Sequence, residues 1–194
     1  MTKRVFLVHG WSGFPEEGWF PWLKQELRAH GFEVLVPQLP DPDRPRIQPW
    51  VSTLAETVGT PDEQTYFVAH SMGCQTIARY LETLSDDVSV GGAVFVAGFF
   101  KHLTGLEDDP DVRETEEHWL GTSTDFAKVK SHLSKSIAIF SDDDPWVPLD
   151  NQEDFRYELG SEIIVEHAKG HFSGGRDGTK ELPIVLQSLL KLAV

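Results

Sequence analysis

A serine in the middle of the chain lies where a catalytic nucleophile would be placed. The sequence AHSMG, residues 69–73, follows an apolar run at 65–69 and precedes an amphipathic stretch. A serine at such a strand-to-helix turn is held in a strained conformation that exposes its hydroxyl group, and small flanking residues let strand and helix approach. The usual pattern is G-x-S-x-G, and Ala69 adds one methyl group at its first position. We interpret Ser71 as a nucleophile for attack on a carbonyl carbon; the alternative is a serine that only caps the helix.

A serine nucleophile needs a base, and the base needs a carboxylate that orients it. Around such turns these groups follow in the order Ser, Asp, His, each just after a strand. An apolar run at 136–140 precedes three consecutive aspartates, and a run at 162–165 precedes His171. We predict that His171 is the base and that Asp144 orients it, because the Pro-rich turn that follows would direct Asp144 across the sheet end. Asp143 is the second choice, and a solvated acidic loop is the alternative interpretation.

Two other side chains compete for catalytic roles. His167 lies four residues before His171, but in or just after a strand, so the pair does not form a helical metal site. We expect no metal and no organic cofactor. Cys74 lies three residues after Ser71, inside the predicted helix, and we expect a small buried thiol rather than a nucleophile.

Acyl attack creates an oxyanion that needs two preorganised N–H donors. The residue after the nucleophile and the loop after the first strand supply them in such sites, which predicts the backbone amides of Met72 and Trp11. The glycines of HGWSG, residues 9–13, permit a close backbone approach there. The further residues that we predict to line a pocket are His9, Gly10, His70, Trp119 and Trp146.

Six apolar runs and the segments between them must position these groups. The predicted strands are 4–8, 33–36, 65–69, 93–97, 136–140 and 162–165, and the predicted helices are 19–30, 50–58, 72–84, 125–133, 150–159 and 183–193. Several strands are apolar on both faces, which is typical of a parallel sheet between two helix layers. Alternating strands and helices predict a right-handed, doubly wound α/β fold.

One connection, residues 101–135, is longer than such folds usually need, so we expect it to be functional or mobile. We predict a single domain over residues 1–194 with this short acidic excursion. Seven acidic residues and one arginine lie between Glu107 and Glu117.

The composition excludes several classes of function. The chain has 194 residues and a formal net charge of −14, with no basic cluster, so nucleic-acid binding is not expected. No apolar run is long enough to span a membrane, and the first residues do not resemble a signal peptide. A single cysteine allows no internal disulfide, and we expect a cytoplasmic protein.

The motifs VFLVHGWSG, FVAHSMGC, SDDDPWVP and KGHF resemble the small serine hydrolases of the α/β-hydrolase superfamily that include retinoblastoma-binding protein nine and the YdeN proteins. The resemblance covers essentially the whole chain. It implies a three-layer α/β/α sandwich, a reduced α/β-hydrolase fold whose six parallel strands have the order 2-1-3-4-5-6. It also implies that Ser71, Asp144 and His171 form a catalytic triad that acts on small carboxyl esters.

We therefore expect a serine hydrolase that cleaves small-molecule esters through an acyl-enzyme. The acidic excursion and Asp142 to Asp144 lie at one predicted sheet edge, which favours neutral or cationic esters over anionic ones. A retinoblastoma-protein partner is not expected, because the only cysteine does not lie in an LxCxE segment. The alternatives are a hydrolase-fold binding protein with weak or no turnover and an acyltransferase with the same triad.

Overall fold

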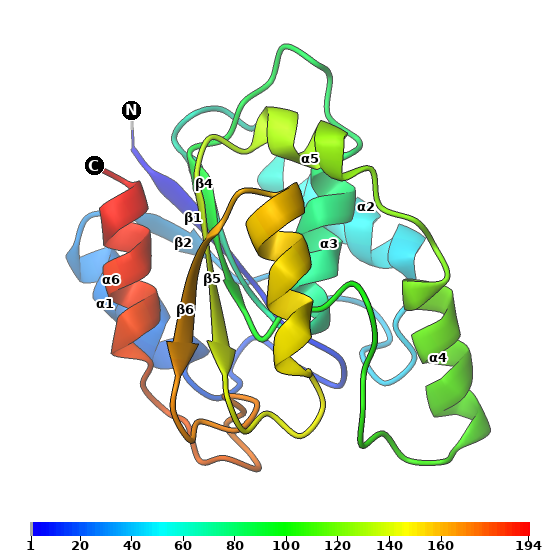
Figure 1. Ribbon diagram of the computed structural model, residues 1–194. Coiled ribbons are helices and arrows are strands. Elements are labelled where there is room, and N and C mark those ends of the chain that lie inside the picture. The colour runs from blue at the N-terminus through cyan, green and yellow to red at the C-terminus, as the bar shows by residue number, and fades with distance from the viewer. Residues whose placement is uncertain (1) are drawn as a thin grey trace.

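The computed structural model describes residues 2–194 as a six-stranded parallel sheet between layers of helices (Figure 1). The strands are β1 Arg4–Val8, β2 Glu33–Leu35, β3 Thr65–His70, β4 Gly92–Val96, β5 Ser136–Ser141 and β6 Glu162–Glu166. Their order is β2-β1-β3-β4-β5-β6, which confirms the predicted fold class and strand order. All six carboxyl ends therefore lie at the same edge, at the bottom of Figure 1.

Helices cover both faces of this sheet. The α-helices are α1 Phe20–Ala29, α2 Ile47–Val58, α3 Met72–Leu81, α4 Pro110–Leu120, α5 Phe126–His132 and α6 Pro183–Leu192. Helices α1 and α6 pack on one face, and α2, α3 and α5 lie over the other (Figure 1). None of the helices in the described part of the chain is long and apolar enough to cross a membrane.

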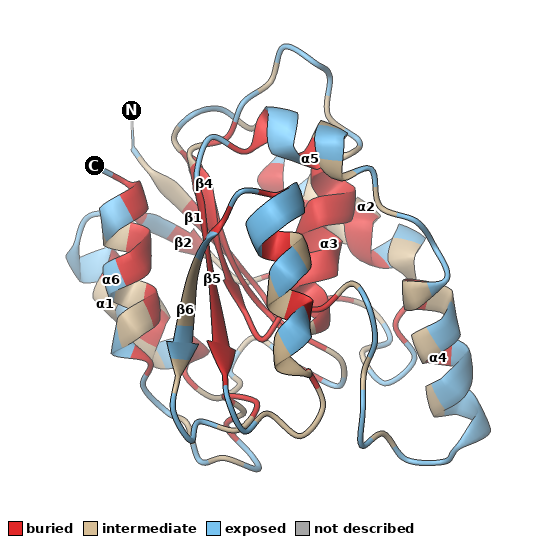
Figure 2. Cartoon of the chain, viewed as in Figure 1, coloured by how far each residue is buried: buried red, intermediate tan, exposed pale blue. Residues whose placement is uncertain are grey.

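The central strands are buried on both faces, as their uninterrupted apolar sequences predict. Every residue of β3, β4 and β5 is buried, whereas the edge strand β6 is partly exposed (Figure 2). One apolar cluster surrounds Trp50 and Phe95 beneath α2 and α3, and a second surrounds Trp19 and Val94 beneath α1 and α6. The two clusters fix both helix layers and hold the carboxyl edge of the sheet in place.

The segment predicted to be a helix at 150–159 is helical over 149–158, but it is not a regular α-helix. The segment forms a 3₁₀ turn, Leu149–Asn151, followed by a π-helical turn, Asp154–Glu158. Asn151 is buried in the first turn, and its side-chain oxygen accepts hydrogen bonds from the amides of Phe100 and Lys101 at 3.2 and 3.1 Å. The Asn151 side chain thus anchors the loop that follows β4 to this helical segment.

Other predicted boundaries shift by a few residues. Helix α2 begins at Ile47, three residues before the predicted start, and α3 ends at Leu81 instead of Leu84. Each strand boundary lies within one residue of its prediction. The differences at the strand ends lie within the one or two residues by which assigned element ends commonly vary, whereas the two helix differences are larger.

The acidic excursion contains a helix that the sequence analysis did not predict. Asp109 caps α4 by accepting a hydrogen bond from the amide of Asp111 at 2.8 Å, and Pro110 occupies the first turn. Ion pairs from Arg44 to Asp111 and from Arg46 to Glu114 connect α4 to the loop after β2. The helix after it, α5, matches the prediction for 125–133.

Candidate active site

Ser71 occupies a strained turn between β3 and α3. Its backbone has φ 54° and ψ −124°, a conformation that non-glycine residues rarely adopt. The Ser71 amide donates to the carbonyl oxygen of Val96 on the neighbouring strand at 2.8 Å, which holds the turn against the sheet. The side chain remains partly exposed at the carboxyl edge, as a nucleophile at such a turn requires.

Two glycines allow the chain to close around this serine. A Cβ atom at Gly10 would lie 2.9 Å from the Cβ of Ser71, so only glycine lets the loop after β1 approach the nucleophile. A Cβ atom at Gly73 would collide with the carbonyl oxygen of Val8 and lie 2.7 Å from that of His9. The first turn of α3 thus packs directly on the backbone at the end of β1.

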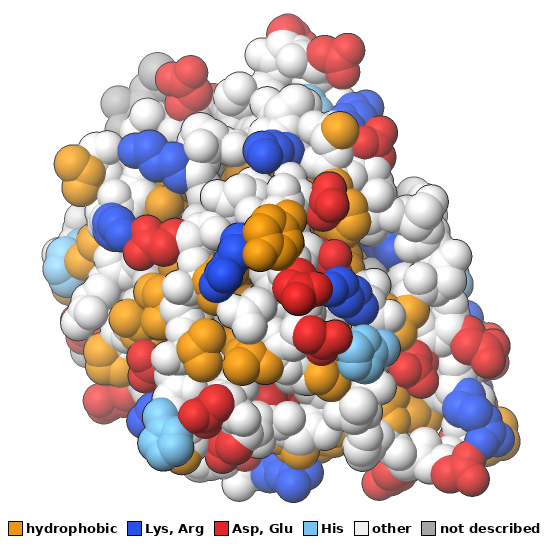
Figure 3. All heavy atoms as spheres, viewed as in Figure 1, with side chains coloured by type: hydrophobic (Ala, Val, Ile, Leu, Met, Phe, Trp, Pro, Cys, Tyr) orange, Lys and Arg blue, Asp and Glu red, His pale blue; other side chains and the backbone are white. Residues whose placement is uncertain are grey.

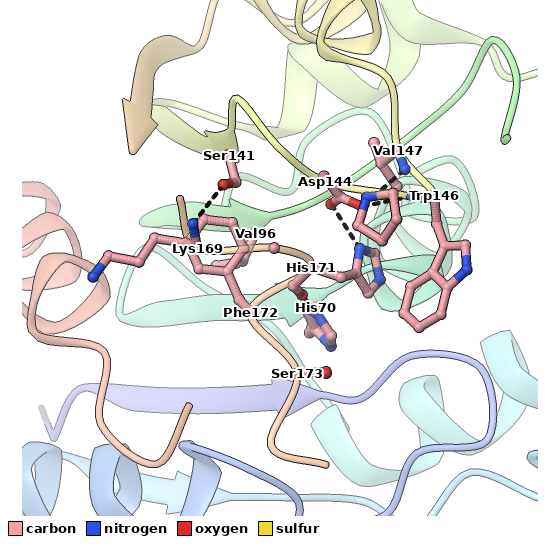
Figure 4. Close-up of polar contacts among 12 residues, drawn as sticks. His70, Val96, Ser141, Asp144, Trp146, Val147, Lys169, His171, Phe172 and Ser173 are labelled. Atoms are coloured by element: carbon pink, nitrogen blue, oxygen red, sulfur yellow. Dashed lines mark hydrogen bonds and ion pairs between the residues drawn. The ribbon is translucent and has the colours of Figure 1, made fainter. Parts of the chain in front are cut away.

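His171 and Asp144 form a buried hydrogen-bonded pair (Figure 4). The Nδ1–H of His171 donates to Asp144 Oδ2 at 2.7 Å, and the two side chains are only 7% and 2% exposed. Asp144 Oδ1 accepts from the amides of Trp146 and Val147 at 2.9 and 3.0 Å. These donors satisfy the carboxylate and fix its direction, because a buried charge is costly without such partners.

The other acidic residues of the same loop have different partners. Asp143 accepts hydrogen bonds from Ser141 Oγ at 2.7 Å and from the amide of Gly170 at 2.8 Å. Asp142 pairs with the exposed His167 at 2.7 Å, an interaction that lowers the pKa of Asp142 and raises that of His167. Geometry therefore favours Asp144 over Asp143 as the partner of His171.

His70 supports the main chain of His171. Its Nε2–H donates to the carbonyl oxygen of His171 at 2.7 Å, and the two imidazole rings lie 4.8 Å apart (Figure 4). Burial lowers the pKa of His70 to about 3, and positive charge on His171 acts in the same direction. His70 is therefore neutral near pH 7 and adds no competing charge beside His171.

The backbone amides of Trp11 and Met72 are free to serve as oxyanion donors. Neither amide donates a hydrogen bond to the protein within residues 2–194, and both residues line the cavity that contains Ser71. The neighbouring amide of Ser12 donates to Pro42 at 2.8 Å, and Gly13 donates to Gly10 at 3.1 Å, so the loop is fixed on either side. Within residues 2–194, His171 forms its side-chain hydrogen bond with Asp144 and none with Ser71 Oγ. In substrate-free active sites the bond between nucleophile and base is often long, and it tightens when substrate binds.

A cavity of about 740 Å³ connects these groups. Its wall includes Ser71, Met72, Trp11, Gly10, His70, Trp146 and His171, so most of the predicted site residues meet there. The Trp146 ring lies edge-on to His171, with centroids 5.0 Å apart. The excursion supplies another part of the wall through Leu103, Leu106 and Val112.

Two residues predicted to line the pocket lie elsewhere. Trp119 is fully buried in the core against Trp50, with its indole N–H donating to Pro45 at 3.0 Å, because α4 turns its apolar side inward. His9 is also fully buried; its Nδ1–H donates to Gly10, and its Nε2 accepts from the Leu39 amide at 3.1 Å. His9 thus stabilises the two loops beneath the cavity and does not form part of its wall.

Cys74 lies beneath the site, as expected. Its side chain is fully buried, with Sγ 3.6 Å from the carbonyl oxygen of Val96, and burial raises the pKa of the thiol. A thiol held neutral in the core is not a nucleophile at ordinary pH.

The sequence analysis missed Asp177, which fixes the loop that carries His171. Its Oδ2 accepts from the amides of His171 and Ser173 at 3.0 and 2.8 Å and from Ser173 Oγ at 2.9 Å. Asp177 directly precedes Gly178, and such an Asp-Gly pair indicates a turn but not this role. The sequence analysis also missed Glu17, whose half-buried side chain lies in the cavity wall.

Sequence comparison assigns the chain to a known protein family. A sequence model described as serine hydrolase matches residues 5–191, nearly the whole chain. The chain belongs to this serine hydrolase family. YdeN from Bacillus subtilis (strain 168) is 35% identical over 189 residues, which cover 97% of this chain and 95% of YdeN. Serine hydrolase RBBP9 from Rattus norvegicus is 27% identical over 195 residues, which cover 100% of this chain and 98% of RBBP9.

Solved structures share the serine hydrolase fold. The crystal structure of the B. subtilis ydeN gene product superposes with a TM-score of 0.88 at 34% identity, covering 98% of each chain. Est1E from Butyrivibrio proteoclasticus gives a TM-score of 0.73 at 15% identity, covering 98% of this chain and 88% of Est1E. The resemblance inferred from the motifs is thus confirmed for the family and for the fold.

Proposed function

We propose that this serine hydrolase cleaves small carboxyl esters with Ser71, His171 and Asp144 as its catalytic triad. The observation that carries the proposal is the hydrogen bond from His171 Nδ1–H to buried Asp144, at the edge where Ser71 is exposed in a strained turn. This bond fixes the tautomer in which His171 Nε2 is free to accept a proton within the same cavity.

In the first half of the reaction, Ser71 Oγ attacks the ester carbonyl carbon while His171 Nε2 takes the hydroxyl proton. The carbonyl oxygen becomes an oxyanion, which the amides of Trp11 and Met72 stabilise. Collapse of this intermediate breaks the bond to the alcohol oxygen. His171 gives its proton to that oxygen, and an acyl-Ser71 remains.

Water completes the reaction. His171 Nε2 takes a proton from water, the hydroxide attacks the acyl carbon, and the proton passes to Ser71 Oγ as the carboxylic acid leaves. Asp144 keeps its negative charge throughout and stabilises the imidazolium. His70 remains neutral beside it, since its pKa of about 3 lies far below the working range.

Replacement of the nucleophile tests the proposal. We expect Ser71→Ala to abolish hydrolysis of p-nitrophenyl acetate and labelling by a fluorophosphonate probe, while circular dichroism and urea unfolding show an intact fold. Cys74→Ala removes the buried thiol and is expected to retain both activities. Hydrolysis by Ser71→Ala at the parent rate would show that the nucleophile is another group.

A matched pair of aspartate variants tests the choice of acid. Asp144→Asn is expected to lower kcat by about 10³- to 10⁴-fold, because the amide no longer selects the active tautomer. Asp143→Asn is expected to remain within about tenfold of the parent, since Asp143 binds Ser141 and Gly170 and not His171. The reverse order of effects would assign the role to Asp143.

A further inference from the structure

Glu17 is a charged group in the cavity wall for which the proposed ester hydrolysis has no role. It lies in the loop between β1 and α1 and lines the same cavity as Ser71 and His171. Its side chain is half-buried, whereas the adjacent Glu16 is exposed and lies outside the cavity lining. A carboxyl group at this depth beside a reaction centre is in a position to contact substrate.

The Glu17 carboxyl group lies close to the catalytic groups. A Cβ atom at Gly13 would come within 2.7 Å of Glu17 Oε2, so the carboxyl group packs on the loop that also presents the amide of Trp11. A Cβ atom at Gly18 would lie 3.1 Å from the backbone nitrogen of Gly174, so the residue after Glu17 lies against the loop that follows His171. This contact places Glu17 on the His171 side of the cavity, and the charge of His171 acts to lower the pKa of Glu17.

Glu17 has no counter-ion of its own. Across residues 2–194, no basic side chain lies within 4.0 Å of its carboxyl group, although Lys180 is near enough to lower its pKa. Asp111, another acidic residue of the cavity wall, does have such a partner, because it pairs with Arg44. Arg176 instead lies over the Trp146 ring, with its guanidinium carbon 5.0 Å from the centroid.

Desolvation is the largest influence on this carboxyl group, and it raises the pKa of Glu17. A partly desolvated carboxylate without a cation is costly in free energy, and a bound cation would recover part of that cost. The Phe14 amide and the more distant charge of Lys180 offset only part of this cost. Within residues 2–194 no basic side chain forms an ion pair with Glu17, and the cavity gives a substrate access to the carboxyl group.

The position of Glu17 on the His171 side of the cavity determines which part of the substrate would carry the positive charge. His171 must protonate the departing alcohol oxygen, so the alcohol portion of an ester lies against His171. We propose that Glu17 binds a cationic nitrogen in that alcohol portion, so that the preferred substrates are small esters of amino alcohols. This inference rests on the proposed ester hydrolysis and adds the substrate class and the residue that selects it.

Two isosteric esters test this selection, acetylcholine and 3,3-dimethylbutyl acetate, which differ by a quaternary nitrogen in place of a carbon. We expect the parent to have a higher kcat/KM for the cationic ester. Glu17→Gln should lower the ratio of the two kcat/KM values by about tenfold, mainly through KM for acetylcholine. Because both kcat/KM values are measured on the same variant, their ratio is unaffected by a general change in that variant's activity.

Glu16→Gln is the matched control, because it removes the same charge from the neighbouring exposed position. We expect the parent ratio for Glu16→Gln and a partly retained preference for Glu17→Asp, which keeps the carboxylate. A parent ratio of one or less, or equal effects of Glu16→Gln and Glu17→Gln, would overturn the proposed role of Glu17.

The test separates this inference from the proposed function. Hydrolysis of 3,3-dimethylbutyl acetate with labelling of Ser71, but without a Glu17-dependent ratio, overturns the substrate class and leaves the serine esterase in place. Absence of both hydrolysis and labelling overturns the two proposals together.

Discussion

At the scale of single residues, two buried neutral histidines, His70 and His9, shape this site as much as the pair of His171 and Asp144 does. His70 holds the main chain of His171 through one hydrogen bond, and His9 connects the loops after β1 and β2 through two. Burial lowers the pKa of both histidines. Each side chain is thus fixed in its neutral form, and its two ring nitrogens have distinct roles, with one donating and the other free or accepting.

The lowered pKa values of these two histidines predict that the folded protein loses stability in acid. Below the unfolded pKa of about 6.5, the unfolded chain binds protons that the folded chain does not, so the free energy of unfolding falls as the pH drops from about 6.5 towards 3. The contribution of His70 is complete above pH 6.5 and is lost as the pH approaches its folded pKa of about 3.

Substitution of His70 isolates this contribution. His70→Gln retains an N–H donor for the His171 carbonyl but does not titrate, so the loss of stability between pH 7 and pH 5 should be smaller by up to about 2 kcal/mol. Urea unfolding at the two pH values provides the measurement. An equal loss in parent and variant would mean that His70 does not carry this pH dependence.

At the scale of elements, the contact of α3 with β1 positions the nucleophile. The first turn of α3 contains Met72 and Gly73, and Gly73 lies directly against the backbone of Val8 and His9. Any side chain at residue 73 forces the helix away from the strand, and with it the Ser71 turn and the loop at Gly10.

Gly73→Ala is therefore expected to destabilise the fold by about 1 to 3 kcal/mol and to reduce ester hydrolysis at the same time. Gly175→Ala is the control for stability, because a Cβ atom there meets nothing within 4 Å, and its unfolding free energy should change by less than about 1 kcal/mol. Chemical unfolding compares the two. A Gly73→Ala protein as stable as the parent would show that α3 can move without cost.

The sequence predicted the strands and most of the helices, but not every element or contact. Apolar strand cores predicted the parallel sheet, and the Ser, Asp, His order predicted the residues that meet at its edge, because both depend on local pattern. The strand order 2-1-3-4-5-6 was implied only by the family resemblance. Helix α4 was missed because its mostly polar sequence shows little apolar periodicity, although Asp109 and Pro110 are a start signal. The hydrogen bonds of Asn151 and the burial of His9 and Trp119 depend on contacts between distant segments, which no local pattern encodes.

At the scale of the whole molecule, the net charge of −14 is distributed unevenly around the cavity. Four acidic residues, Glu17, Asp43, Glu107 and Asp111, and two arginines line it. On the face in Figure 3, several acidic side chains and fewer basic ones lie over the α4 region. Arg113 pairs with Asp108, and Arg44 pairs with Asp111. These pairs reduce the field of the excursion, but acidic residues still outnumber basic ones at the cavity.

The remaining field predicts a bias against anionic esters. A cleft lined by one sign of charge lowers the local concentration of ligands of that sign, and the effect weakens as salt screens it over about 10 Å at 0.1 M. We expect p-nitrophenyl hemisuccinate to be hydrolysed with a lower kcat/KM than p-nitrophenyl butyrate at low ionic strength, with the gap narrowing in 0.5 M NaCl. Equal values at low salt, or a gap that salt does not change, would argue against steering by the field. Because the Glu17 contact acts at short range, the acetylcholine preference should be less sensitive to salt than this long-range bias, so salt distinguishes the two electrostatic effects within one protein.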